Sequence, residues 1–211
     1  MTGTTRADLR LLVWDAPNMD MALTGLLGRQ PRGDERPRFE AVARWLVSQA
    51  APDEEVEACV FANVPEGAAG RMAGWVKMLR SYGYSVFVKP RLSGSDIDED
   101  MLGHVHRRGA EADLRGLVVA SGDSRLFREP LEKLAAEEVE VTVLGFAEET
   151  TYAQVSGRLR FQDLEDLPDA FLTPLPRARL DNLPPEGRWL PPLAPLRQAV
   201  GARADGAEDF G

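Results

Sequence analysis

Acidic residues follow three short apolar runs of the chain, each near the point where the run ends. These acids are Asp15, Asp98, Asp100 and Asp123. Burying an unpaired carboxylate costs several kcal/mol, so packing does not explain their positions. Carboxylate oxygens gathered at one place are ligands that hard cations such as Mg²⁺ or Mn²⁺ prefer. The pattern therefore predicts a metal site built from acids that are distant in the sequence.

Capping of a following helix is the alternative role for these acids. Asp15 and Asp123 stand where a carboxylate can accept backbone N–H bonds, and we weigh capping and metal binding equally there. We expect Ser124 to be the N-cap of the helix that follows Asp123, and Gly122 to serve a tight turn or a close approach of phosphate.

A helix is also predicted to begin near Asp98. Asp96 and Glu99 have the spacing of a capping box, which favours a cap over a metal ligand at Asp96. Asp98 and Asp100 are two residues apart in the first turn, so their side chains point in different directions. We favour Asp98 as the residue that faces the site and keep Asp100 as a second candidate ligand.

Basic side chains lie close to the acids. Lys89 and Arg91 follow the third apolar run, and Arg125 stands two residues after Asp123. Each is a candidate contact for a phosphate group. Neutralising the nearby acids is the alternative, which we weigh equally.

The elements that must position these residues alternate between strand and helix. Strands are predicted at Leu9–Trp14, Val56–Val64, Tyr84–Val88, Leu117–Ala120 and Val139–Leu144, and helices at Pro37–Ala50, Ala68–Tyr82, Ile97–Ala112 and Ser124–Glu137. Such alternation predicts an α/β protein whose parallel sheet is covered on both faces. Ligands of these sheets bind beyond the carboxyl ends of the strands, where the acids stand.

Composition narrows the class of protein. The chain has 211 residues, a formal net charge of −9 and an isoelectric point near 4.9, which argues against bulk electrostatic coating of nucleic acid. A nuclease that meets phosphates through a cation remains open. Cys59 is the single cysteine, so no internal disulfide forms, and we expect it in the core. Trp14, Trp45 and Trp75 fall on core positions, so we do not expect them to stack on bases.

Neither a membrane span nor a signal peptide is predicted, so a cytoplasmic protein is expected.

Eight of the fifteen prolines lie after residue 162, interspersed with apolar residues. Because proline breaks helices and denies a strand its donor, this stretch is not a regular core element. We predict a domain at 1–162 and a Pro-rich C-terminal arm at 163–211 that docks on the domain, with 201–211 fraying.

Three segments carry a family resemblance. Val13–Asn18, Asp96–Leu102 and Val118–Asp123 resemble the signature segments of NYN domains, which belong to the PIN-like superfamily of metal-dependent ribonucleases. The similarity spans roughly residues 8–147. It implies a three-layer α/β/α fold with a mainly parallel sheet of five or six strands.

The resemblance also implies a function and a set of site residues. It implies an endoribonuclease that uses Mg²⁺ or Mn²⁺ to cut single-stranded RNA, with Asp15, Asp98 and Asp123 as metal ligands. Asn18 and Ser121 would be polar supports that also reach the substrate.

Two departures from the family pattern favour an alternative. Arg125 and His104 stand where relatives often carry further acids, which favours a PIN-like module that binds RNA or protein without cutting it. A phosphatase-like hydrolase is a weaker alternative, since Pro17 occupies the place of its second aspartate. A homodimer, and a protein partner bound through the arm, stay open.

Overall fold

The computed structural model describes residues 6–91, 97–180, 183–190, 192 and 195–197. The predicted cap at Asp96 and the predicted fraying of 201–211 lie outside these residues. In the described part of the chain, six strands form one sheet in the order β3-β2-β1-β4-β5-β6, and every neighbouring pair is parallel. The strands are β1 (Asp8–Asp15), β2 (Glu55–Val64), β3 (Ser85–Pro90), β4 (Asp113–Ala120), β5 (Glu140–Gly145) and β6 (Arg160–Asp163).

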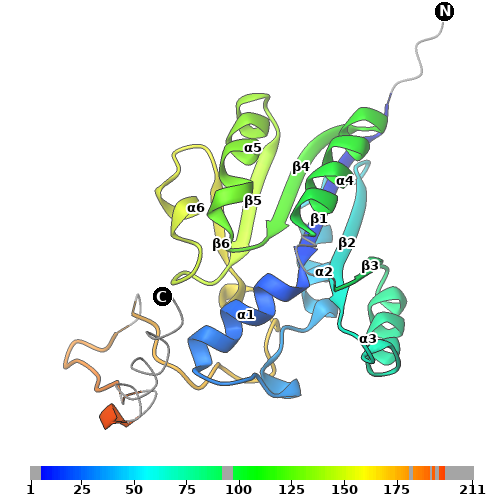
Figure 1. The fold of residues 1–211 in the computed structure, drawn as a ribbon. Helices are drawn as coiled ribbons and strands as arrows, with labels where there is room; N and C mark the ends of the chain where they lie inside the picture. Colours follow the sequence, from blue (N-terminus) through cyan, green and yellow to red (C-terminus); the bar gives the residue numbers. More distant parts are fainter. Residues whose placement is uncertain (1–5, 92–96, 181–182, 191, 193–194, 198–211) are drawn as a thin grey trace, which may run out of the picture.

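Helices cover both faces of this sheet, which gives the three layers that were predicted (Figure 1). One face is covered by α4 (Asp98–Glu111), α5 (Ser124–Ala136) and α6 (Thr151–Val155). The other packs on residues of α1 (Ala16–Leu27), α2 (Phe39–Ser48) and α3 (Ala69–Ser81). None of the helices in the described residues is long and apolar enough to cross a membrane.

The central strand β1 shows why the sheet needs two helical layers. Leu9, Leu11 and Val13 face the core under α4 and α5, whereas Leu12 and Trp14 face the core on the other side. Successive side chains of a strand point to opposite faces, so a strand with apolar side chains on both faces must be buried on both. β1 is the strand that both halves of the sheet flank.

Helix α1 was not among the predicted elements, and neither were α6 and β6. In α1, Met19, Leu23 and Leu26 lie on the face toward the core, but the exposed Met21 lies on the opposite face and weakens the apolar periodicity. Pro17 lies in its first turn, where a missing N–H costs nothing because that group has no partner inside a helix.

The first part of the Pro-rich arm packs on the sheet. Leu164, Leu167, Ala170 and Leu175 are buried in the core with α1 and α2. The change of composition at residue 162 is therefore not the end of the core. Trp189, farther along, is 97% exposed, so docking of the arm is found at its beginning and not there.

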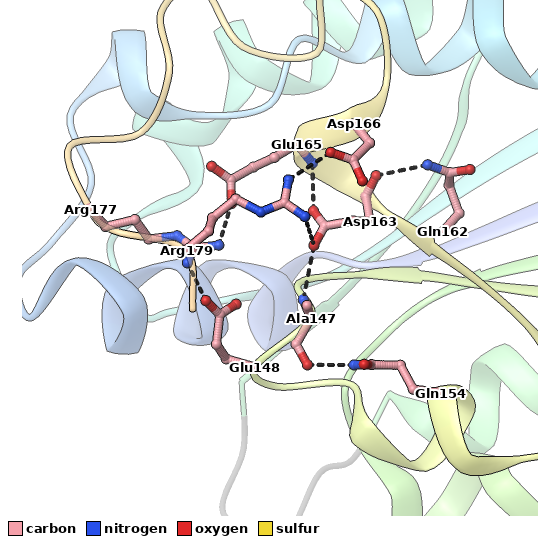
Figure 2. A network of polar contacts seen from close by, with 9 residues as sticks. All are labelled: Ala147, Glu148, Gln154, Gln162, Asp163, Glu165, Asp166, Arg177 and Arg179. Atoms are coloured by element: carbon pink, nitrogen blue, oxygen red, sulfur yellow. Dashed lines mark hydrogen bonds and ion pairs between the residues drawn. The ribbon is translucent and has the colours of Figure 1, made fainter. Parts of the chain in front are cut away.

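Arg177 and Arg179 form ion pairs within the beginning of the arm, and Arg177 also joins the arm to the connection after β5 (Figure 2). Arg177, whose side chain is 8% exposed, forms ion pairs with Glu148 and Glu165. Arg179 pairs with Asp163, at an N–O distance of 3.4 Å. Burial raises the pKa of both Asp163 and Glu165. Glu148 belongs to the connection between β5 and α6, so the arm holds this connection in place.

A buried carboxylate also fixes the connection between α1 and α2. Both oxygens of Glu35 accept hydrogen bonds from the Arg29 guanidinium, at 2.6 and 2.7 Å, and one also accepts from the backbone N–H of Arg32 at 2.8 Å. Hydrogen bonds from Arg29 first, then from Arg32, lower the pKa of Glu35 to about 2.

Glu35 makes the stability of the fold depend on acidity. Because its pKa is lower in the folded than in the unfolded chain, where it is about 4.3, its contribution is present above that value. We expect the contribution to disappear as the pH falls toward about 2. Urea unfolding at several pH values tests this. Glu35→Gln should be less stable than wild type at pH 7, and the difference should shrink on acidification; a constant difference would contradict it.

Leu164 tests whether the arm belongs to the core. Its side chain is fully buried, so Leu164→Ala should lower the free energy of unfolding by about 2–5 kcal/mol. Leu180→Ala, in the same arm at a position that is 61% exposed, is the matched control and should change it little. If urea unfolding showed an equally small change for both substitutions, the arm would not stabilise the domain.

Candidate functional site

The order of the strands reverses between β1 and β4. The chain runs outward from β1 to β2 and β3, then crosses back to place β4 on the other side of β1. Connections on the two sides leave in opposite directions, and the carboxyl ends of these two strands border a crevice where ligands of such sheets bind. Asp15 ends β1, and Ser121 directly follows β4.

Asp15 is buried at this crevice, with 3% of its surface exposed. One carboxylate oxygen accepts a hydrogen bond from the backbone N–H of Asn18 at 3.0 Å, which makes Asp15 the N-cap of α1. The other oxygen accepts from the hydroxyl of Ser121 at 3.4 Å. Capping thus uses one oxygen, and the second oxygen turns toward the end of β4.

Ser121 is fully buried and joins the two acids of the crevice. Its hydroxyl donates to Asp15 and accepts from the backbone N–H of Asp123 at 3.3 Å. Asp123 in turn accepts from the backbone N–H of Arg125 at 2.8 Å. Asp123 is therefore the N-cap of α5, and the expectation that Ser124 has this role is wrong, because the carboxylate one residue earlier reaches the free N–H.

Asn18 ties the two strand ends together. Its side-chain oxygen accepts a hydrogen bond from the backbone N–H of Gly122 at 2.8 Å. A Cβ placed on Gly122 would lie 3.1 Å from the carbonyl oxygen of Glu149 and 3.5 Å from the Asn18 oxygen. This close packing explains why glycine stands at this position. A positive φ does not, because Gly122 is not among the glycines with a positive φ.

The connection after β5 contributes two residues that the sequence did not point to. Glu149 covers Gly122, and the Tyr152 hydroxyl donates to the carbonyl oxygen of Ser121 at 3.3 Å. Burial raises the pKa of Tyr152, and the charge of Asp123 adds to this effect, so the hydroxyl stays protonated. One feature of the sequence could have pointed to this connection. Glu148 and Glu149 follow a predicted strand, as the other acids of the site do.

Other predicted residues lie in the first turns of α4 and α5 and at the end of β3. Asp98 is 7% exposed in the first turn of α4, behind the N-cap Ile97. Asp100 forms an ion pair with Lys89, which is the charge-balancing role that was the alternative for Lys89. Arg125 has an 88% exposed side chain 3.8 Å from an Asp123 oxygen.

The predicted convergence of three acids is not found among the residues that the structure describes. No three His, Cys, Asp or Glu side chains in this part of the chain are grouped to hold a metal ion. Ser121 links the carboxylate of Asp15 to the backbone N–H of Asp123, and each of these two acids also caps a helix. Carboxylate oxygens are hard donors, so the chemistry of this pair fits Mg²⁺ or Mn²⁺ even though two acids alone make a small ligand set.

The fold and the crevice together define a class of protein. A doubly wound parallel sheet, with an aspartate ending β1 and a Ser-Gly-Asp turn after β4, is the arrangement of PIN-like nuclease domains. The family model of the NYN domain matches residues 10–165, and the chain belongs to this family. The resemblance seen in three short segments is thereby confirmed.

A solved structure shares the fold. The crystal structure of a protein of unknown function from Vibrio parahaemolyticus is similar with a TM-score of 0.50 and 20% sequence identity. The similarity covers 81% of this chain and 99% of that chain. Comparison with curated proteins gives no match.

The contact between Gly122 and Glu149 can be tested by adding one methyl group. Gly122→Ala should lower the free energy of unfolding by about 1–3 kcal/mol, because the backbone carbonyl of Glu149 must move. Gly103→Ala, within α4 where nothing lies within 4 Å, is the control and should raise it by about 0.5–1 kcal/mol. If urea unfolding gave a gain for both variants, the turn would not be held by this contact.

Proposed function

We propose that the chain is a divalent-metal-dependent ribonuclease that hydrolyses phosphodiester bonds of single-stranded RNA in the crevice between β1 and β4. The observation that carries this proposal is the Ser121 hydroxyl, which lies between the carboxylate of Asp15 and the backbone of Asp123 at the switch point. Membership of the NYN family supports the same reaction class.

Mg²⁺ or Mn²⁺ would be held by Asp15 and Asp123; Asp98, in the first turn of α4, is not grouped with them among the described residues. Bound there, the cation would lower the pKa of a water molecule and neutralise charge that develops on the phosphoryl oxygens. The metal ligands would be carboxylate oxygens, which suit these hard ions. They lie at the carboxyl ends of the strands, where ligands of such sheets bind. Asp100 is a weaker candidate, because it is paired with Lys89.

The other residues position these acids or contact the RNA. Ser121 is fully buried, so it acts as a positioning residue that orients Asp15 and Asp123. Asn18 holds the turn at Gly122 at a fixed distance from α1. The exposed guanidinium of Arg125 stands beside Asp123, where it would contact a phosphate of the substrate.

A module that binds RNA without cutting it is the second candidate. The described residues form no group of three acids, and Arg125 lies close to Asp123. A cationic side chain next to one acid of a pair lowers the need for a bound cation. This candidate predicts RNA binding that is independent of Mg²⁺ and Mn²⁺.

Asp123→Asn separates the two candidates. The substitution keeps the shape and the helix cap but removes the charge that binds a cation, so cleavage of single-stranded RNA should fall by at least about 100-fold. Gel analysis of RNA fragments, with either metal and with chelator, measures this. The thermal unfolding midpoint should change little.

Asp53→Asn provides the matched control. Asp53 is an exposed residue before β2, at the amino end of the strand and away from the carboxyl ends that border the crevice, and its loss should leave cleavage unchanged. A pure wild-type protein that cuts no RNA with either metal would reject the ribonuclease and support the binding module.

A further inference from the structure

A large groove opens on the face of the molecule that carries α1, α2 and α3. It has a volume of about 1240 Å³ and is lined by these helices and by the carboxyl end of β2. Trp14, Ala16 and Pro17, which flank Asp15 in the chain, line the same groove. It exceeds the roughly 300–1,000 Å³ of common small-molecule sites. The groove therefore begins next to the proposed site and has room for an extended ligand.

The groove is basic although the protein is acidic. The charged residues that line it are Arg36, Arg38, Arg71, Arg91, Asp20 and Glu40. Four cations against two acids leave a net positive lining on a chain whose formal charge is −9. This excess attracts an anionic ligand.

Two of these arginines have no acid to neutralise them in the part of the chain that the structure describes. Arg36 pairs with Asp20, and Arg38 lies 3.7 Å from Glu40. Within the described residues, Arg71 and Arg91 form no ion pair, and both are exposed. Arginine donates in a planar fork that fits phosphate oxygens, so these two positions suit a phosphodiester backbone.

The groove also offers surfaces for bases. Trp75 was predicted to be a core residue, but it is half-buried, lines the groove and meets Phe39 edge-on at a centroid distance of 6.3 Å. Met72, also half-buried, lies on the same helix one turn away. Aromatic rings next to arginines are the combination that binds single-stranded nucleic acids.

One polar atom of the groove lining is unsatisfied. Asn63, near the end of β2, lines the groove, and its buried side-chain oxygen has no hydrogen-bond partner among the described residues. An acceptor buried without a donor costs free energy, which a donor group of a base would offset once the amide turns toward it.

We propose that this groove binds the single-stranded RNA on one side of the cleaved phosphate. Arg71 and Arg91 contact phosphates, and Trp75 stacks on a base. The inference rests on the proposed ribonuclease function, because RNA is the anion that the adjacent crevice would cut. It adds to that function the path that the RNA takes, from the crevice at Asp15 across the face formed by α1, α2 and α3.

Binding of a fluorescein-labelled 12-nucleotide oligouridylate, followed by fluorescence anisotropy, tests the path. Chelator in the buffer prevents cleavage, so the measurement reports binding alone. Arg71→Ala together with Arg91→Ala should weaken binding at least tenfold and reduce the slope of log K against log salt by about 0.7 for each phosphate that is no longer neutralised. Trp75→Ala should weaken binding about tenfold with an unchanged slope.

Arg80→Ala is the matched control. Arg80 is an exposed arginine of the same helix α3 but does not line the groove, so its removal should leave affinity and slope unchanged. If the Arg71 and Arg91 variant binds as the Arg80 variant does, the groove does not carry RNA. Oligoglutamate that displaces the RNA at equal concentration, with no effect of Trp75→Ala, would overturn RNA in favour of an acidic protein partner.

The two proposals fail in distinguishable ways. Cleavage by wild type with unchanged binding in the groove variants overturns the path and leaves the ribonuclease standing. Groove-dependent binding by a wild type that cuts no RNA with Mg²⁺ or Mn²⁺ overturns the ribonuclease, and the groove then serves the binding module.

Discussion

The parallel pairing of β1 with a strand on each side is the constraint on which the rest of the structure depends. Because β2 and β4 both run parallel to β1, every connection must cross a face of the sheet, and both faces must be covered by helices. The same pairing brings the ends of β1 and β4 side by side. The carboxylate of Asp15 and the turn that begins at Ser121 meet for this reason alone.

A carboxylate buried at the end of β1 needs hydrogen-bond donors. The groups that donate to it stabilise the fold and also position it for the proposed chemistry. Asp15 uses one oxygen to begin α1 and the other to accept from Ser121, and Asp123 begins α5 in the same way. The caps fix the carboxylates without consuming all of their lone pairs. Residues that stabilise the helices thus also hold the crevice ready for a ligand.

The parts of the molecule that could be predicted from the sequence are those marked by a run of apolar residues or by a short motif. Apolar runs gave five of the six strands of the described sheet, and the segments around Asp15 and Asp123 identified the family. Helix α1 was not predicted because Met21, on its exposed face, weakens the periodicity of the buried residues Met19 and Leu23. Charge balancing was one of the two roles weighed for Lys89, and its pairing with Asp100 is that role. The groove that includes Trp75 was not predicted, because it joins elements whose separation in space no local pattern encodes.

The wide spacing of the site along the chain has a consequence for synthesis. Asp15 and Ser121 are 106 residues apart, and Arg177, which holds the loop beside them, comes 29 residues after its partner Glu148. A chain leaving the ribosome therefore exposes Asp15 long before β4 can insert beside β1. The crevice between β1 and β4 can therefore form only after the residues up to Ser121 have been synthesised, so any chemistry that it performs depends on the insertion of β4 beside β1.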